Sequence, residues 1–179
     1  LSEAERLLEE AGYGEGGEEI SLELKAPNNP AYVLDTSVIA AEHFNQLPNV
    51  EVDVIQQSYD EWISETWLNS QFYTSWYGQE ILAILQLEIV WHSEGSWNEA
   101  NWSNDEFDQA LENAISTSDE EQHQEYIETC ERILYERGPS IIPVFRNMIS
   151  GTQNYVNGFV PSKEETIVDL TEVWLDESA

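Results

Sequence analysis

Residues 50–57 read VEVDVIQQ, and residues 19–26 read EISLELKA. Apolar side chains alternate with polar ones in both stretches, which is the period of a β-strand that buries one face. Between them, NNP at residues 28–30 breaks the chain, and Leu34, Val38, Ala41 and Phe44 recur at helical spacing. This alternation of strand and helix predicts an α/β fold in which helices cover a mixed β-sheet.

A third strand is predicted in FYTSWYGQE, residues 72–80, where four aromatic side chains precede the first charge at Glu80. Ligands of α/β sheets bind beyond the carboxyl ends of strands. We therefore expect ligand contacts at Trp76, Tyr77, Gly78, Gln79 and Glu80, where glycine admits a close backbone approach and Glu80 can pair with a positive group. The alternative is that Trp76 belongs to the core and Glu80 only favours a helix dipole.

The remaining elements are predicted from caps and periodicity. Helices are expected at residues 2–11, after Ser58, at 104–116 and at 119–137, with a strand in SIIPVF and an extended tail. QEILAILQLEIVW, residues 79–91, is expected to be a buried helix, although its β-branched residues leave a strand possible. The helix starts are taken from four S-x-x-E capping boxes: Ser2 with Glu5, Ser58 with Glu61, Ser103 with Glu106, and Ser118 with Glu121.

The charge balance is strongly acidic. The 179 residues include 36 Asp plus Glu against 6 Lys plus Arg, a formal charge of -30. Nucleic acids and anionic membranes are poor partners for such a chain, because both attract basic patches. A hydrophobic content of 41% supplies a core and argues against disorder. Acid spread along a chain with a core is typical of proteins from high salt, so we predict a halophilic source.

The sequence holds few groups arranged for catalysis. Phosphate-binding loops, dinucleotide fingerprints, nucleophile elbows and paired CxxC motifs are missing. The histidines His43, His92 and His123 are widely separated, and His123 is expected to be solvated. Carboxylate pairs occur at every spacing by chance, so they identify no acid–base dyad. We predict a non-enzyme without a metal or cofactor, in which Cys130 is a buried structural thiol.

The loop WHSEGSWNEANWSN, residues 91–104, places Trp91, Trp97 and Trp102 among asparagines and serines. Tryptophans in a polar loop suit a binding surface, and Trp102 joins the predicted ligand contacts. They could equally cover the core. Two further readings stay open beside ligand binding: a hydrolase that uses two carboxylates, and a non-catalytic protein-interaction domain with exposed tryptophans.

Several stretches, in order, resemble the family 5 solute-binding proteins of ABC importers, the dipeptide-, oligopeptide- and nickel-binding group. They are AERLLEEAGYGEGGEEISLEL, VEVDVIQQSYDEWIS, NSQFYTSWYG, VNGFVPS and, as the best match, NWSNDEFDQALENAISTSDEEQHQEYIETCERILYERGPSIIPVF. The resemblance implies that residues 1–179 form the C-terminal lobe of a two-lobed, type II periplasmic-binding-protein-like fold.

The resemblance also implies a function. The complete protein would be a monomeric extracytoplasmic receptor that traps a peptide or related solute and delivers it to a membrane permease. In a halophilic archaeon it would be lipid-anchored at the cell surface. Peptide-binding members carry an Asp after the Gly-Trp strand, whereas SWYGQEILAILQL has none and Glu80 is the nearest acid. A sugar, another amine-bearing solute or a metal chelate therefore remains open as the ligand.

Overall fold

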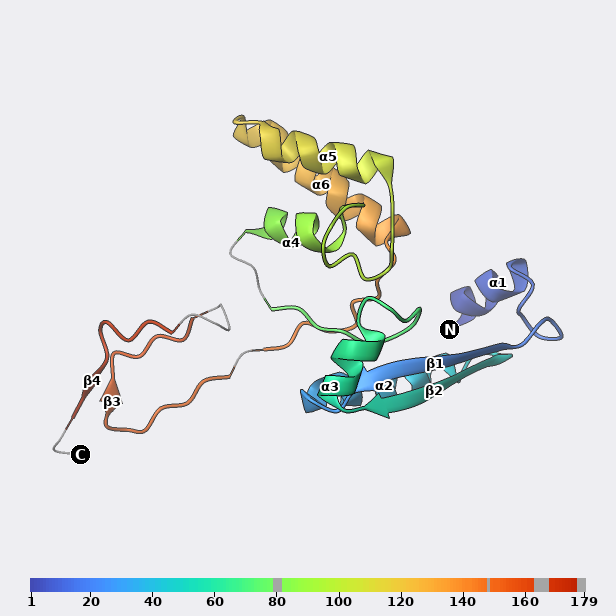
Figure 1. Cartoon of the computed structure of the whole chain (residues 1–179), viewed down its shortest axis with the longest axis horizontal. Coiled ribbons are helices and arrows are strands. Elements are labelled where there is room, and N and C mark those ends of the chain that lie inside the picture. The colour runs from blue at the N-terminus through green and yellow to red at the C-terminus, as the bar shows by residue number, and fades with distance from the viewer. Residues whose placement is uncertain (79–81, 148, 163–167, 177–179) are drawn as a thin grey trace. The chain divides into compact units, whose positions relative to one another are not determined.

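The computed structural model describes residues 1–78, 82–147, 149–162 and 168–176 (Figure 1). The chain divides into two compact units, Leu1–Trp76 and Tyr77–Ala179, here called the first and second unit. Each is described by itself.

The first unit is built on two parallel strands. Its elements are, in order, α1 (Ser2–Glu10), β1 (Ile20–Pro27), α2 (Ala31–Phe44), β2 (Val50–Gln57), α3 (Tyr59–Glu61) and the π-helical turn η1 (Trp62–Thr66). β1 pairs with β2 from Ile20 opposite Val50 to Pro27 opposite Gln57. The helix α2 connects the two strands and packs against them (Figure 1). The strands and the helix between them are as the sequence predicts.

The packing of α2 differs from its predicted apolar stripe. The helix buries Val33, Ser37 and Ala41, whereas Val38 is 43% exposed. The small side chains of Ser37 and Ala41 let the helix backbone lie close to the sheet. The Ser37 hydroxyl is satisfied there, because it donates to the Val33 carbonyl oxygen at 2.8 Å.

The predicted third strand does not form over residues 72–78, the part of it that the structure describes. Residues 72–74 make a single bridge, in which Lys25 pairs with Tyr73. The Thr74 N–H donates to the Lys25 carbonyl at 2.9 Å, and the Lys25 N–H donates to the Phe72 carbonyl at 3.3 Å. The rings of Tyr73 and Trp76 in this segment pack against Trp62.

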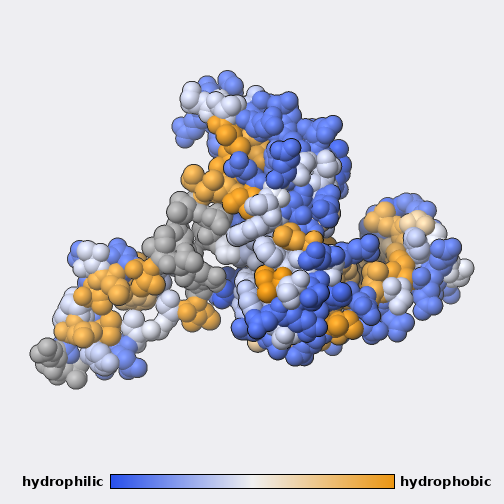
Figure 2. Space-filling model, viewed as in Figure 1, coloured by the Kyte–Doolittle hydropathy of each residue, from blue (hydrophilic) through white to orange (hydrophobic). Residues whose placement is uncertain are grey.

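Among its described residues, the second unit is built on three helices, α4 (Ala83–Val90), α5 (Asp105–Ser116) and α6 (Glu120–Arg137). α4 settles the choice between helix and strand in favour of a helix over residues 83–90, and it buries Leu87 and Val90. α5 and α6 lie side by side (Figure 1). The surface of these two helices that Figure 2 shows is mostly hydrophilic. Their shared core is made by Leu87, Phe107, Ala110, Leu111, Ala114, Ile127, Cys130 and Ile133.

Cys130 is buried, as predicted, and burial raises the pKa of its thiol to about 11. His123, predicted to be solvated, is partly exposed and also makes a structural hydrogen bond. Its ring is half-buried, and Nδ1 donates to the Ala114 carbonyl at 2.9 Å, which ties α6 to the end of α5.

Helix caps follow the prediction at one of four positions. Ser58 accepts from the Glu61 N–H at 3.2 Å, as expected. α5 is instead capped by Asn104, which accepts from Phe107 N–H, and α6 by Asp119, which accepts from Gln122 N–H, both at 3.0 Å. The predicted Ser103 and Ser118 each stand one residue too early, because Asn and Asp cap as well as Ser and lie nearer the helix. The cap residue of α1 is Leu1, which makes no side-chain cap.

The tail contains one small antiparallel pair, β3 (Val156–Asn157) with β4 (Trp174–Leu175). The strand predicted in SIIPVF, residues 140–145, is absent; these residues are exposed and pair with none of the described strands. Pro143 cannot donate to a sheet ladder, which weakens the pairing of so short a segment. Within the described ranges, no helix is both long and apolar enough to cross a membrane.

Candidate ligand-binding site

The carboxyl ends of β1 and β2 lie at one edge of the sheet, where Pro27 is opposite Gln57. The chain that follows β2 builds a polar group at this edge. The Thr66 hydroxyl donates to Gln57 Oε1 at 2.7 Å, and Gln57 Nε2 lies 3.4 Å from Glu61 Oε1. Gln57 and Thr66 are both buried. The amide of Gln57 therefore fixes the π-helical turn to the end of the strand, and such turns are frequent at functional sites.

An aromatic cluster stands on this turn. The rings of Trp62 and Trp76 are 5.5 Å apart, Trp62 and Tyr73 are 6.0 Å apart, and Tyr59 is 6.2 Å from Trp76. Trp62 forms the buried base, Trp76 is half-buried, and Tyr59 is exposed. We call Tyr59, Trp62, Tyr73 and Trp76 the Trp76 cluster. The exposed rings of the cluster offer a surface on which an apolar or planar part of a ligand can stack.

The base of the cluster contains an unsatisfied donor. Trp62 is 2% exposed, and its indole N–H has no acceptor among the described residues. Leaving such a donor buried and unpaired costs about 1–3 kcal/mol. A ligand oxygen at this position would remove that cost.

The predicted site residues are distributed over both units. Trp76 lies in the Trp76 cluster. Tyr77 and Gly78 are exposed in the second unit, where Tyr77 contacts Trp91 and Trp97. Gln79 and Glu80 lie outside the described residues.

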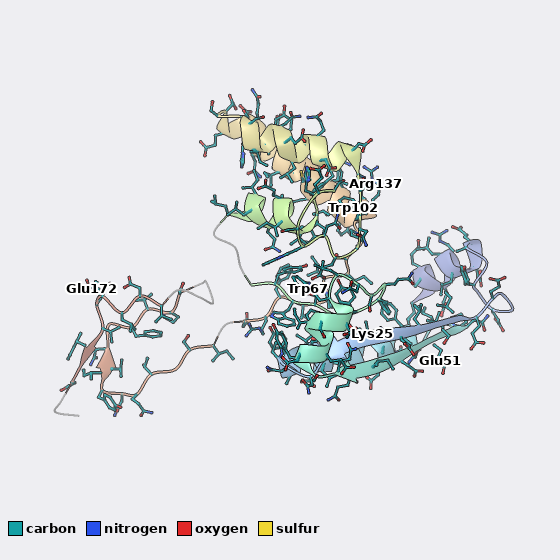
Figure 3. All side chains as sticks on the ribbon, in the orientation of Figure 1. Lys25, Glu51, Trp67, Trp102, Arg137 and Glu172 are labelled. Atoms are coloured by element: carbon teal, nitrogen blue, oxygen red, sulfur yellow. The ribbon has the colours of Figure 1, made fainter. Side chains whose placement is uncertain are left out.

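Trp102 lies on the loop before α5 and is half-buried (Figure 3). Its ring packs edge-on against Phe107, with centroids 5.2 Å apart, and it is part of the core of the second unit. This is the arrangement expected of a tryptophan that covers the core.

Sequence reasoning missed Tyr59, Gln57 and Thr66 as members of the site, and it treated Trp62 only as a helix marker. The available signal was the position of SYDEWISET, residues 58–66, directly after a strand whose carboxyl end should face a ligand.

The loop between α4 and α5 is held by Asn98. Its side chain accepts from the Trp102 N–H at 3.0 Å and donates to the carbonyl oxygens of Trp102 at 2.7 Å and His92 at 3.2 Å. All three bonds are to backbone groups. The loop tryptophans are therefore carried on a defined scaffold.

Ser93, His92 and Asp108 approach one another without forming a catalytic triad. The Ser93 hydroxyl donates directly to Asp108 Oδ2 at 2.5 Å, and His92 Nε2 lies 4.0 Å from Asp108 Oδ1. In a triad the histidine stands between serine and carboxylate and accepts the serine proton. Here the carboxylate anchors the loop to α5. Across the described ranges, no three His, Cys, Asp or Glu side chains are grouped closely enough to hold a metal ion.

No protein-family model and no curated protein matches the chain. Solved structures do. The oligopeptide-binding protein AppA from Bacillus subtilis, in complex with a nonapeptide, matches with a TM-score of 0.74 and 17% identity over 98% of this chain and 37% of AppA. OppA from Haemophilus influenzae, in complex with RPPGFSPFR, matches with a TM-score of 0.71 and 21% identity. The match covers 97% of this chain and 34% of OppA. NikZ from Campylobacter jejuni, in complex with Ni(L-His), matches with a TM-score of 0.64 and 21% identity. The match covers 77% of this chain and 30% of NikZ.

The chain has the periplasmic-binding-protein-like fold. The predicted α/β fold class is thereby confirmed, with the small sheets described above. The chain spans about a third of the length of AppA and OppA.

Proposed function

We propose that residues 1–179 are the C-terminal lobe of a family 5 solute-binding protein, the receptor component of an ABC importer. The match of almost the whole chain to one third of AppA and of OppA is the observation that carries this proposal. The receptor captures a peptide or a related small solute between two lobes and delivers it to permease subunits in the membrane. It has no catalytic role.

The proposed ligand contacts are Trp76 in the first unit, to which we add Tyr59 and Trp62, and Tyr77, Gly78, Gln79 and Glu80 in the second. Trp102 was also expected from the sequence, but its ring covers the core of the second unit. The position of the Trp76 cluster at the carboxyl edge of β1 and β2 supports the assignment, since ligands bind at that edge of α/β sheets. The unsatisfied Trp62 N–H supports it independently, because a ligand oxygen would complete its hydrogen bonding.

The complete receptor works outside the cytoplasmic membrane as a monomer, anchored by lipid at the cell surface of a halophile. The likeness to solute-binding proteins supports the location, and the charge of -30 supports the salt-rich setting. The same charge argues against nucleic acid as a partner.

Calorimetry on the complete two-lobed receptor and on the isolated chain tests the proposal, with RPPGFSPFR and Ni(L-His) as probes. We expect the receptor to bind a solute of this kind and the isolated chain to bind it at least ten-fold more weakly, because one lobe makes only part of the contacts. Equal affinity of the two proteins, or binding of neither probe and of no other peptide, would contradict the proposal.

Substitutions locate the site on the complete receptor. Trp76→Ala and Tyr59→Ala should weaken binding, each by roughly 1–2 kcal/mol, about 5- to 30-fold. Tyr135→Ala is the matched control, because Tyr135 is 92% exposed on α6. If Tyr135→Ala weakens binding as much as Tyr59→Ala does, the Trp76 cluster is not the site.

A further inference from the structure

A second group of aromatic rings lies in the second unit. The Tyr77 ring is 6.4 Å from that of Trp97, with 25° between the ring planes, and 6.5 Å from that of Trp91, with 50° between them. We call these three residues the Tyr77 strip. Tyr77 is 37% and Trp97 39% exposed, whereas Phe107 in the neighbouring core is fully buried. The strip therefore presents ring surface to solvent that the core does not use.

The rings of the strip are positioned by the fold. Trp91 follows α4 directly and packs against the core of the second unit. The Trp97 N–H donates to the Ile89 carbonyl at 2.9 Å, and the next residue is Asn98, which holds the loop. A ligand that stacks on the strip therefore meets rings that are already in place, and the entropy cost of ordering them is small.

A hollow of about 480 Å³ is formed by residues that neighbour the strip in the sequence. It is lined by residues of α4 and of the turn after it: Glu88, Ile89, His92, Glu94, Gly95 and Ser96. Trp91 and Trp97 are the direct neighbours of His92 and Ser96 in the chain. The lining contains two carboxylates and no Lys or Arg.

Two arginines of α6 pair with one carboxylate of α5. Arg137 donates to Glu106 Oε2 at 2.6 Å, and Arg132 lies 3.6 Å from Glu106 Oε1. The carboxylates of the hollow thus add to the negative field of a chain whose net charge is -30. The faces of tryptophan and tyrosine attract a cation within about 6 Å by about 0.5–1 kcal/mol at exposed sites. Ring faces and carboxylates together favour a positively charged ligand group.

We propose that the Tyr77 strip and the hollow bind an organic cation, the alkylammonium or guanidinium group of a solute. The cation lies on the ring faces of Tyr77 and Trp97, and Glu94 and Glu88 supply the opposite charge. This rests on the proposed function, because it names the class of solute that the receptor takes.

Choline and its uncharged analogue 3,3-dimethyl-1-butanol distinguish charge recognition from simple stacking, since the two have nearly the same shape. Both are titrated by NMR into the full chain at constant ionic strength. We expect choline to bind at least ten-fold more tightly. Equal binding of the two would overturn the proposal in favour of an uncharged ligand such as a sugar, and so would binding of neither.

Variants test the assignment to these residues. Trp97→Ala should weaken choline binding about 3- to 10-fold and Glu94→Gln about 2- to 5-fold. Trp174→Ala should leave it unchanged, because Trp174 is an exposed tryptophan on β4. Glu94→Gln preserves shape, so it keeps the test valid if Trp97→Ala does not fold. Unchanged choline binding in a folded Trp97→Ala or in Glu94→Gln would overturn the proposal.

The two proposals fail separately. A complete receptor that binds peptides or other solutes but does not prefer choline over its analogue refutes the cation site alone. A chain that prefers choline but whose complete receptor binds no solute between its lobes refutes the receptor function and leaves a cation-binding domain.

Discussion

Raising the pH should destabilise the second unit through one thiol. Cys130 is fully buried, and its Sγ donates to the Phe107 carbonyl at 3.8 Å. Burial, together with the nearby carboxylates of Glu131 and Asp108, raises the pKa of this thiol from 9.0 to about 11. In the unfolded chain the thiol is in water and titrates near its ordinary value. Between these two pH values the folded chain keeps a proton that the unfolded chain has lost.

The size of the effect follows from the shift. The stabilisation is fully present below the pKa of the unfolded thiol and is lost as the pH rises towards about 11. A difference of roughly 2 pKa units corresponds to about 3 kcal/mol of unfolding free energy, at about 1.4 kcal/mol per unit. Cys130→Ala removes this contribution and leaves a small cavity, whose cost of about 1 kcal/mol does not depend on pH.

Urea unfolding of both proteins, followed by far-ultraviolet circular dichroism in molar KCl, measures the effect. The comparison is made in unit steps from neutral pH to about 11. All other titratable groups are common to both proteins and cancel in the difference. The stability advantage of the wild type over Cys130→Ala should fall by roughly 2 kcal/mol across the range, because at about pH 11 the folded thiol is itself half ionised. A constant advantage would refute the reasoning.

Three further predictions concern caps, ion pairs and salt. Asn104→Ala should lower the free energy of urea unfolding by about 1 kcal/mol, whereas Ser103→Ala should change it little, because Asn104 makes the cap of α5. A larger loss for Ser103→Ala than for Asn104→Ala would show that Ser103 is the cap, as the sequence predicts. Arg137, at the end of α6, lowers the pKa of Glu106 by hydrogen bonding. The stability that this pair provides is therefore present above the carboxyl pKa of the unfolded chain and is lost as the pH falls through the lowered pKa of the folded chain. Glu106→Gln should make the unfolding free energy depend less on pH on the acid side, and an unchanged pH dependence would count against the pair. The register of β1 and β2 sets Glu23 beside Asp53, so molar KCl should stabilise the chain, and Glu23→Gln should reduce that gain. Circular dichroism that is the same in dilute buffer and in molar KCl would argue against salt adaptation.

The elements that sequence predicts best are those whose pattern depends on local burial. The strands β1 and β2 alternate because one face is covered by α2, and the α5–α6 pair has long amphipathic repeats. The strand prediction for SIIPVF was wrong because a strand also needs a neighbouring strand to pair with, and a local sequence pattern does not show whether one is there. The caps shifted by one residue because Ser103 and Asn104 are equally good candidates by chemistry, and the packing of the following helix decides between them.

The candidate site remains a prediction. FYTSWYG indicates a segment rich in rings, and the ring of Trp76 lies 5.5 Å from that of Trp62, on the turn that follows β2. The partners of Trp76 come from a different segment, where a π-helical turn puts Trp62 beneath it. That turn depends on the buried pairing of Gln57 with Thr66, nine residues apart, which has no periodic signature in the sequence.

The buried indole of Trp62 gives the molecule a built-in optical probe. An indole shielded from water emits at shorter wavelength than one in solvent, so Trp62 contributes the blue edge of the fluorescence, while Trp97 and Trp174, both more than a third exposed, contribute the red edge. A solute that accepts a hydrogen bond from the Trp62 N–H would shift only the blue component. Emission spectra could therefore follow occupancy of the Trp76 cluster without any added label.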